Sequence, residues 1–272
     1  MARQPIITLT TDFGSADYFV GVMKGVVLNV NPEVQLVDLS HEVASFSVLD
    51  GALTIGLNYA FFPEGTLHVV VVDPGVGSAR RPIIARTAHH TFVAPDNGVL
   101  SVVFEREATL EVRHITADRY FLHPVSSTFH GRDVFARVAG WLSRGIPAEN
   151  FGGVINDYLR ITIPRPRRLN HQQSEASVIR VDKFGNLMTN LRREDLPERI
   201  SPERASFKII IKGREIARLA ASFAEGSPLE PFSYIGSSGF LEIALNEGSA
   251  AQLLSAGPGT EITLHISDPN QP

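Results

Sequence analysis

The sequence predicts an α/β N-terminal domain with a mostly parallel central sheet, followed by a smaller all-β, barrel-like C-terminal domain. Strand-like and helix-like stretches alternate over the first 160 residues, a pattern typical of helices layered on a parallel sheet. Beyond residue 175 short strands dominate, which favours a small β-rich domain. The chain has 272 residues, of which 43% are hydrophobic and 20% charged, so it can bury a core in either arrangement.

The N-terminal elements follow from apolar runs and their spacing. Residues 66–73 (TLHVVVVD) are apolar enough for a central strand. Residues 17–30 have helical spacing and stop before Pro32. The expected elements are strands at 7–12, 35–40 and 66–73, helices at 17–30 and 48–62, a hairpin from 83–87 and 90–95, and further elements in 98–105, 110–116 and the amphipathic 133–145.

The character of the chain changes near residue 164, where two prolines, an arginine cluster and a polar run follow one another. We therefore expect residues 1–163 to form the α/β domain, 164–174 the linker, and 175–272 the β-rich domain. The expected C-terminal elements are strands at 177–182, 207–213, 214–220, 239–245 and 260–267, with a short helix at 249–254.

Composition excludes several classes of partner and site. The net charge is -4 and no basic stripe occurs, which argues against a nucleic-acid partner. Cysteine is absent, so there is no disulfide, thiolate metal site or cysteine nucleophile. No apolar run reaches the roughly 20 residues of a membrane span, and the chain enters a strand too early for a signal peptide. We expect a cytoplasmic protein with no membrane partner.

Three polar clusters follow expected strands, where α/β sheets usually bind ligands. In the first, TTDFGSAD, Asp12 ends a strand and Asp17 begins a helix. A carboxylate such as that of Asp12 can accept hydrogen bonds from the vicinal hydroxyls of a ribose. A turn role explains Asp12 equally well, and a helix N-cap role is sufficient for Asp17.

The second cluster is VVVVDPGVGSARR, in which Asp73 ends a buried strand and Arg80 follows after a glycine turn. The stretch resembles the start of a dinucleotide-binding fingerprint, but Arg80 occupies the place of the third glycine, so we reject a nicotinamide fold. A salt bridge that stabilises the turn is the simplest interpretation of the two charges. Arg81 competes with Arg80 for the same role, and spacing alone does not separate them.

The third cluster, SSTFHGRD, places His130 just before a helix, where the imidazole could face a cleft. Arg132 and Asp133 are expected to cap and bridge rather than react. A metal site is a poor fit, because His89 and His90 are adjacent in an expected strand and would point to opposite faces.

Two stretches of the C-terminal domain are candidate ligand contacts. RVDKFGNLMTNL places Phe184 and Asn186 around a glycine turn, and an aromatic face beside an amide can recognise a nucleobase. An ordinary hairpin turn explains this pair equally well. In YIGSSGFLEIALNEGSA the small residues would let a ligand approach the backbone, or simply form a tight loop.

No cluster is decisive alone, but their order is informative. TTDFG, DPGVGSARR, APDNG, TFHGRD, DKFGNLMTN and YIGSSGFLEIALNEG follow one another over residues 6–267. In this order they resemble the S-adenosyl-L-methionine (SAM) hydroxide adenosyltransferases, also called SAM hydrolases, which are related to the fluorinases and chlorinases. The resemblance implies hydrolysis of SAM, which is the substrate, without a metal or another cofactor. It also implies a homotrimer in which the N-terminal domain of one subunit and the C-terminal domain of its neighbour share each site.

The resemblance also assigns roles to residues. The family's catalytic set falls on Asp73, Arg80 and His130, which selects Arg80 over Arg81. The implied substrate contacts are Asp12 with the ribose hydroxyls, Asp17 with the methionine amino group, Phe46 near the sugar and adenine, Asn97 in a pocket-lining turn, and Phe184, Asn186, Ser237, Ser238 and Asn246 with adenine and the methionine end.

Within this family the sequence favours a hydrolase. The halogenating relatives carry tyrosine in place of Asp73 and His130, and Gly131 stands where a fluorinase has a halide-contacting serine. Water would attack the ribose C5′ carbon and release adenosine and methionine, and the base could be either Asp73 or His130. Alternatives are a chlorinase-like halogenase and a non-catalytic adenosine- or SAM-binding protein. A phosphohydrolase with Asp12 as nucleophile would need a second acid where Gly14 stands.

Overall fold

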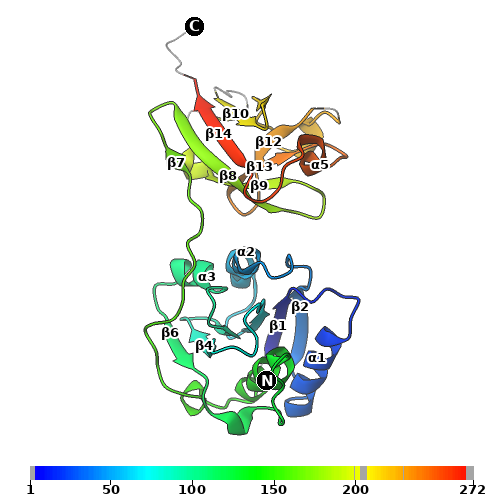
Figure 1. The fold of residues 1–272 in the computed structure, drawn as a ribbon, viewed down its shortest axis with the longest axis vertical. Coiled ribbons are helices and arrows are strands. Elements are labelled where there is room, and N and C mark those ends of the chain that lie inside the picture. The colour runs from blue at the N-terminus through cyan, green and yellow to red at the C-terminus, as the bar shows by residue number, and fades with distance from the viewer. Residues whose placement is uncertain (1–3, 199, 203–206, 229, 268–272) are drawn as a thin grey trace. The chain divides into compact units, whose positions relative to one another are not determined.

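The computed structural model describes residues 4–198, 200–202, 207–228 and 230–267. Contacts divide the chain into two compact units, Met1–Ile163 and Pro164–Pro272. Each unit has its own sheet (Figure 1). The first combines helices and strands, and the second consists mainly of strands, so the predicted fold class is confirmed.

The sheet of the first unit is mostly parallel. Its strand order is β2-β1-β3-β5-β4-β6, and within it only β4 runs antiparallel to its neighbours. The antiparallel β4–β5 pair is the hairpin expected from the sequence. The strands are β1 (Ile6–Thr11), β2 (Gln35–Ser40), β3 (Leu67–Val71), β4 (Pro82–Arg86), β5 (Thr91–Pro95) and β6 (Glu111–His114).

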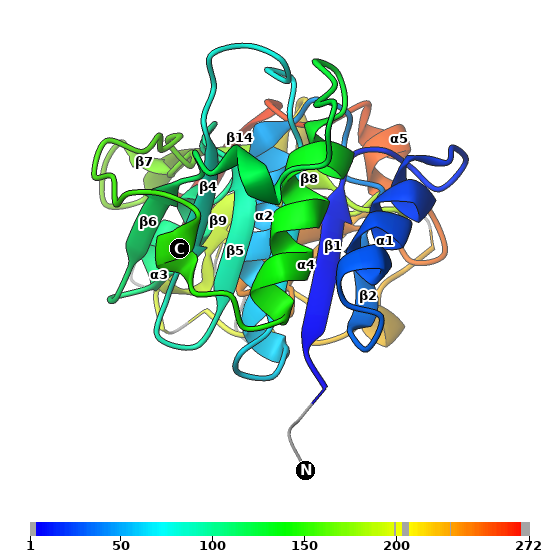
Figure 2. The same ribbon diagram turned by 90° about the horizontal axis from the view of Figure 1, so that it is seen from below.

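Helices cover both faces of this sheet (Figure 2). The helices α1 (Phe19–Val30) and α4 (Arg137–Ser143) pack on one face, and α2 (Val48–Asn58) and α3 (Ser101–Arg106) pack on the other. The side chains of the four valines 69–72 alternate between the cores on the two faces. All four positions are buried for this reason, which explains the continuous apolar run.

The two long N-terminal helices are shorter than their apolar spacing predicts. The chain of α1 becomes helical at Phe19 rather than at residue 17, and α2 ends at Asn58, after which Tyr59–Phe61 forms a 3-10 turn. The side chain of Asn58 donates to the carbonyl oxygen of Thr54, which satisfies an acceptor of the last helical turn.

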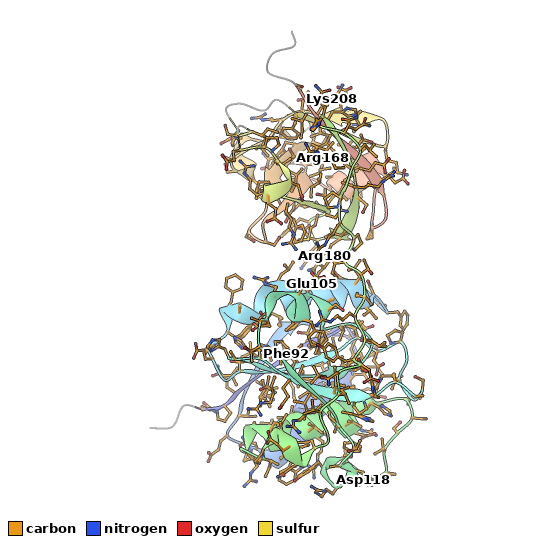
Figure 3. All side chains as sticks on the ribbon, turned by 90° about the vertical axis from the view of Figure 1, so that its left-hand side faces the viewer. Phe92, Glu105, Asp118, Arg168, Arg180 and Lys208 are labelled. Atoms are coloured by element: carbon orange, nitrogen blue, oxygen red, sulfur yellow. The ribbon has the colours of Figure 1, made fainter. Side chains whose placement is uncertain are left out.

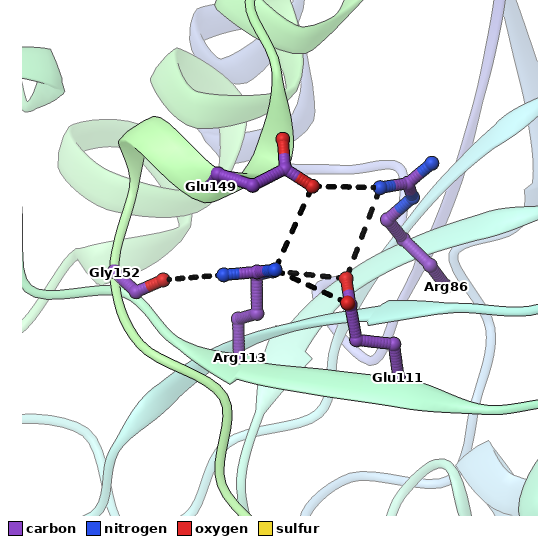
Figure 4. A network of polar contacts seen from close by, with 5 residues as sticks. All are labelled: Arg86, Glu111, Arg113, Glu149 and Gly152. Atoms are coloured by element: carbon purple, nitrogen blue, oxygen red, sulfur yellow. Dashed lines mark hydrogen bonds and ion pairs between the residues drawn. The ribbon is translucent and has the colours of Figure 1, made fainter.

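A charged network fastens one edge of the sheet to the segment after α4 (Figure 4). Arg113 on β6 donates to Glu111 at 2.9 Å and to the carbonyl oxygen of Gly152 at 3.1 Å, and it lies 3.6 Å from Glu149. Arg86, at the end of β4, lies 3.2 Å from Glu149. The network lies where β6 begins, at the end of the sheet opposite to the carboxyl ends of the parallel strands.

The sheet of the second unit is barrel-like and its named pairs are antiparallel. Its order is β11-β10-β14-β8-β9-β13-β12, with β7 paired to β8. A short helix, α5 (Ala250–Leu254), follows β13. The strands are β7 (Arg167–Arg168), β8 (Gln173–Val181), β9 (Leu187–Arg192), β10 (Phe207–Ile211), β11 (Arg214–Ile216), β12 (Phe232–Ile235), β13 (Phe240–Ala244) and β14 (Glu261–Ile266).

Two features of the second unit differ from the sequence-based expectation. Part of the expected linker 164–174 is strand, because the chain folds back so that Leu169 and Asn170 both donate to Gln173 and β7 pairs with β8. The strands β9 and β12 were not identified from the sequence. Both carry polar residues within a short apolar pattern, and only their neighbours in the sheet define them.

The interior of the first unit is densely packed. Phe92 on β5 is fully buried in the core between the sheet and the helices α2 and α3 (Figure 3). In the part of the chain that is described, no helix is long and apolar enough to cross a membrane, and no group of three or more His, Asp or Glu residues is arranged to bind a metal ion.

His89 and His90 lie in the loop between β4 and β5 rather than in a strand, so the strand assignment was wrong.

Candidate functional site

The site of the first unit begins at the carboxyl ends of two neighbouring strands. Strands β1 and β3 are parallel, and Thr11 pairs with Val71. Asp12 follows Thr11 directly and Asp73 comes two positions after Val71, so both carboxylates lie at the carboxyl end of the sheet. The sequence-predicted clusters converge here because parallel neighbours end together.

Asp73 and Arg80 form a closed ion pair across one turn. Arg80 donates from Nε to Oδ1 of Asp73 at 2.8 Å and from Nη2 to Oδ2. The side chain of Arg80 is only 8% exposed and that of Asp73 only 5%, so the solvent screens the attraction between their charges little. Gly77 within the turn has φ +77°, and a Cβ at that position would lie 2.2 Å from the carbonyl oxygen of Ser127. Glycine therefore lets the turn approach the segment that carries His130.

His130 joins this pair through Arg80. The Nη2 atom of Arg80 lies 2.9 Å from Nδ1 of His130. A guanidinium can only donate, so Nδ1 accepts and a neutral His130 carries its proton on Nε2. Burial, followed by the charge of Arg80, lowers the pKa of His130 below its ordinary value. The imidazole is therefore neutral at pH 7 and offers an Nε2–H donor.

Arg80 has a further donor that the protein does not satisfy. Its Nη1 atom is buried and has no hydrogen-bond acceptor among the described residues. The guanidinium lies over the ring of Phe135, with Cζ 5.0 Å from the ring centroid, which holds its plane in place. Buried donors are usually satisfied by protein or by ordered water, so Nη1 is suited to hold a small oxygen ligand.

The segment before α4 fixes His130. Residues Gly131–Ala136 form a π-helix, a feature frequent at functional sites. Asp133 is fully buried, accepts from the backbone of Ser126 at 2.8 Å and pairs with Arg132. The expected ion pair between these two neighbours is thus present, and its carboxylate also holds the loop that leads to His130.

The two adjacent arginines, Arg80 and Arg81, bind different carboxylates. Arg81 points away from Asp73 and donates to Asp96 at 2.7 Å and to Asp157 at 2.8 Å. Asp96 is only 3% exposed and also accepts from the backbone of Leu159. Arg81 therefore fastens a loop, while Arg80 is the arginine of the polar site.

Asp12 holds a strained phenylalanine. Its Oδ2 accepts from the backbone N–H of Phe46 at 2.8 Å. Phe46 has φ +65°, which costs a non-glycine residue about 1–2 kcal/mol, and its side chain is 74% exposed. A strained backbone that presents an exposed ring at the edge of a sheet is a feature of ligand-binding sites.

Asp17 and Asn97 differ in their contacts, since Asp17 is exposed and Asn97 bonds to the backbone. Asp17 is exposed, and the N-cap of α1 is Tyr18, so the N-cap interpretation of Asp17 was wrong. The side chain of Asn97 donates to the carbonyl oxygen of Val72 at 2.8 Å and accepts from the backbone of Val99 at 3.1 Å. Its amide therefore fixes the end of the strand immediately before Asp73.

The second unit has a pocket of about 500 Å3. Three predicted residues line it: Phe184, which is 75% exposed, Asn186, which is 5% exposed, and Ser237. Ser238 and Asn246 are not among the lining residues. The hydroxyl of Ser238 is buried and has no partner in the described part of the chain, while Asn246 donates to the carbonyl oxygen of Gly226 at 3.0 Å.

Sequence reasoning missed four polar residues of this pocket, namely Arg180, Asp182, Tyr234 and Glu242. Tyr234 donates to Glu242, and burial is the main cause that raises the pKa of both side chains. The signal was present in the strand GFLEIAL, where Glu242 interrupts an otherwise apolar run. A carboxylate in the middle of a buried strand is unusual and indicates a polar pocket.

Comparisons with known proteins agree over almost the whole chain. Residues 7–152 match the model of the SAM hydroxide adenosyltransferase N-terminal domain, and residues 176–263 match that of its C-terminal domain. An (R)-S-adenosyl-L-methionine hydrolase of Salinispora arenicola is 33% identical, covering 96% of this chain and 98% of that protein. A fluorinase of an Actinoplanes strain is 26% identical, covering 96% and 97%. The crystal structure of a conserved protein from Thermotoga maritima superimposes with a TM-score of 0.89 at 36% identity, covering 95% and 99%.

Proposed function

This chain belongs to the SAM hydroxide adenosyltransferase family, and we propose that it hydrolyses S-adenosyl-L-methionine to adenosine and L-methionine. The observation that carries the proposal is the contact of Asp73, Arg80 and His130 in one buried polar cluster. The printed name of the Salinispora arenicola relative supports the same activity.

The reaction is a displacement at carbon. A water oxygen forms a bond to the ribose C5′, the bond from C5′ to the sulfonium sulfur breaks, and its electron pair leaves with methionine. One proton of the water is released. The leaving group becomes neutral when the bond breaks, so the weak nucleophile is the part of the reaction that needs help from the protein.

In this proposal each of the three residues has its own role in positioning and deprotonating the attacking water. Arg80 holds the carboxylate of Asp73 through Nε and Nη2, and His130 fixes Arg80, so that a water can bond to a free lone pair of Asp73 with its oxygen toward C5′. Neutral His130 is not the base, because its Nδ1 already accepts from Arg80. Asp73 accepts the proton, since each carboxylate oxygen retains a lone pair after its bond to Arg80.

The other predicted residues bind the substrate in this proposal. Asp12 accepts from the ribose hydroxyls, Phe46 packs against the nucleoside, and the exposed Asp17 pairs with the ammonium group of the methionyl end. In the second unit, the exposed ring of Phe184 stacks on adenine, and Asn186 contacts the edge of the base. Asn97, Ser237, Ser238 and Asn246 complete the set, Asn97 through the strand end that it fixes.

The direct test incubates the purified protein with SAM and measures adenosine and methionine by chromatography. We expect both products in equal amounts, and we expect Asp73→Asn to form them at least about 100 times more slowly. Incorporation of oxygen from labelled water into adenosine would confirm attack at C5′. Equal rates in the parent and the Asp73→Asn variant would show the proposal to be wrong.

A halogenase activity is the second candidate, because fluorinases also match this chain over nearly its full length. The negative charge of Asp73 does not exclude a halide from the site, since Arg80 compensates this charge. Gly131 stands where a fluorinase has its halide-contacting serine, which argues against a halide site. The structure leaves little room for a side chain at this position, because a Cβ there would lie 3.2 Å from the sulfur of Met23. Adding chloride or fluoride to the same assay tests this candidate through a halogenated adenosine.

Assembly into a homotrimer is part of the same proposal and rests on the family resemblance. Light scattering of the purified protein tests it through a mass of three chains of 29.7 kDa.

A further inference from the structure

The turn between β8 and β9 is organised by one carboxylate. Oδ1 of Asp182 accepts from the backbone N–H groups of both Phe184 and Asn186, each at 2.9 Å. Oδ2 of Asp182 accepts from the side-chain Nδ2 of Asn186 at 2.8 Å. The backbone of Asp182 accepts from Gly185 and donates to Asn186, which closes the turn. The position of Asn186 is therefore set by both the main chain and the carboxylate.

These bonds also determine which way the amide of Asn186 faces. A carboxylate accepts hydrogen bonds and does not donate them, so only the NH2 group of Asn186 can lie against Asp182. The carbonyl Oδ1 of Asn186 is then turned away from Asp182. No hydrogen bond to this oxygen occurs within the described residues, although Asn186 is only 5% exposed and lines the pocket.

We propose that Asp182 is a positioning residue that fixes the Asn186 amide with its oxygen toward the pocket, so that the pocket selects a 6-aminopurine over a 6-oxopurine. The proposal rests on the proposed function for the identity of the ligand as a purine nucleoside. The exposed ring of Phe184 at the same turn provides the stacking surface for the base. A 6-amino group donates to the Asn186 oxygen, whereas a 6-oxo group would place two acceptors opposite each other.

Replacing Asp182 by asparagine should reverse this selection without removing the turn. The Oδ1 atom of the new side chain still accepts from the backbone of Phe184 and Asn186. Its amide nitrogen now faces Asn186 where Oδ2 stood. Two NH2 groups cannot satisfy each other, so the Asn186 amide rotates by 180° and presents its NH2 group to the pocket.

The experiment measures the Kd values of adenosine and inosine by titration calorimetry with the full-length protein. We expect the parent to bind adenosine about ten times more tightly than inosine, since one hydrogen bond to a buried acceptor accounts for roughly that factor. In Asp182→Asn the ratio should fall to about one or below it. Asp195→Asn is the matched control, because Asp195 accepts from the backbone of Arg192 outside the pocket, and it should keep the parent ratio.

A purely structural role of Asp182 predicts a different result. Asp182→Asn would then weaken adenosine and inosine by the same factor and leave their ratio unchanged, which would overturn the inference. A parent that binds neither nucleoside, or that does not prefer adenosine, would also overturn it. Because binding is measured without turnover, a protein that shows the ratio change yet fails to cleave SAM supports this inference and contradicts only the proposed hydrolysis.

Discussion

The Nη2 atom of Arg80 lies 2.9 Å from Nδ1 of His130, and the same nitrogen donates to Oδ2 of Asp73. One nitrogen thus joins a carboxylate and an imidazole that come from different segments of the chain. The arrangement fixes the tautomer of His130 and leaves Nη1 of Arg80 as a donor without a partner in the described part of the chain. Changes to Arg80 should therefore affect both neighbours at once.

We expect Arg80→Lys to lower kcat for SAM hydrolysis by a factor of about 100 to 1,000, since a single ammonium cannot pair with Asp73, His130 and a water in fixed geometry. Steady-state kinetics measures the change. Arg81→Lys is the matched control, because Arg81 pairs with Asp96 and Asp157 instead. It should change kcat less than threefold and lower the free energy of unfolding by about 1 kcal/mol. Equal losses of kcat in the two variants would contradict the assignment.

The acid limb of the pH–rate profile should report on His130. Burial and Arg80 lower its pKa below 6.5, so the imidazole is neutral at pH 7 and gains a proton only in more acidic solution. The productive form is the neutral one, and kcat/KM should therefore be constant near pH 7 and fall only in more acidic solution, at a pH below the ordinary histidine pKa of 6.5. His130→Asn should be slower by about 100-fold or more and should lack this limb. The same acid limb in the variant would assign the titration to another group.

Phe46→Gly should separate binding from stability. Glycine removes the strain of φ +65°, about 1–2 kcal/mol, but costs about 0.5–1 kcal/mol of chain entropy, so the free energy of unfolding should change by no more than about 1.5 kcal/mol. Loss of the exposed ring should raise the KM for SAM by about tenfold. Phe61 is also exposed, at 83%, but lies in a 3-10 turn. Phe61→Gly should lower stability by about 1 kcal/mol and leave KM unchanged.

A buried histidine should make the protein sensitive to acid. His68 is fully buried between Thr8, at 2.7 Å from its Nδ1, and His90, at 3.2 Å from its Nε2. Burial, and then the neighbouring His90, lowers the pKa of His68 to about 3. The unfolded state, with a pKa near 6.5, therefore binds the proton first as the pH falls between these values.

This linkage should cost about 2 kcal/mol of stability at pH 5 relative to pH 7.5, because 1.5 pH units below 6.5 correspond to about 1.36 kcal/mol each. Urea unfolding at the two pH values measures it. His68→Gln should be less stable than the parent at pH 7.5 but should lose about 2 kcal/mol less on acidification. The exposed His171 provides the control, since His171→Gln should keep the pH dependence of the parent. A His68→Gln variant with the full acid loss would show that other groups cause it.

The sequence predicted the sheet of the first unit well, because its inner strands β1, β3, β5 and β4 are largely buried and are rich in apolar residues. It predicted the second unit less completely. In β9 and β12 polar residues such as Thr189 and Ser233 are fully buried and donate to backbone carbonyls of other segments, and no local pattern reveals those partners. The contact between Arg80 and His130 spans 50 positions and is equally invisible to local spacing. The resemblance selected Arg80 over Arg81, and in the structure Arg81 pairs with Asp96 and Asp157 instead of Asp73.

The ion pair of Asp73 and Arg80 closes over only seven positions of the chain. Two of the three residues of the proposed catalytic set are therefore encoded in a single short turn, whereas the residues proposed to bind the nucleoside lie elsewhere in the sequence. At this part of the site, relatives that use different nucleophiles can therefore diverge through a change in one contiguous stretch of the chain, whereas the position of His130, 50 residues further on, must change separately.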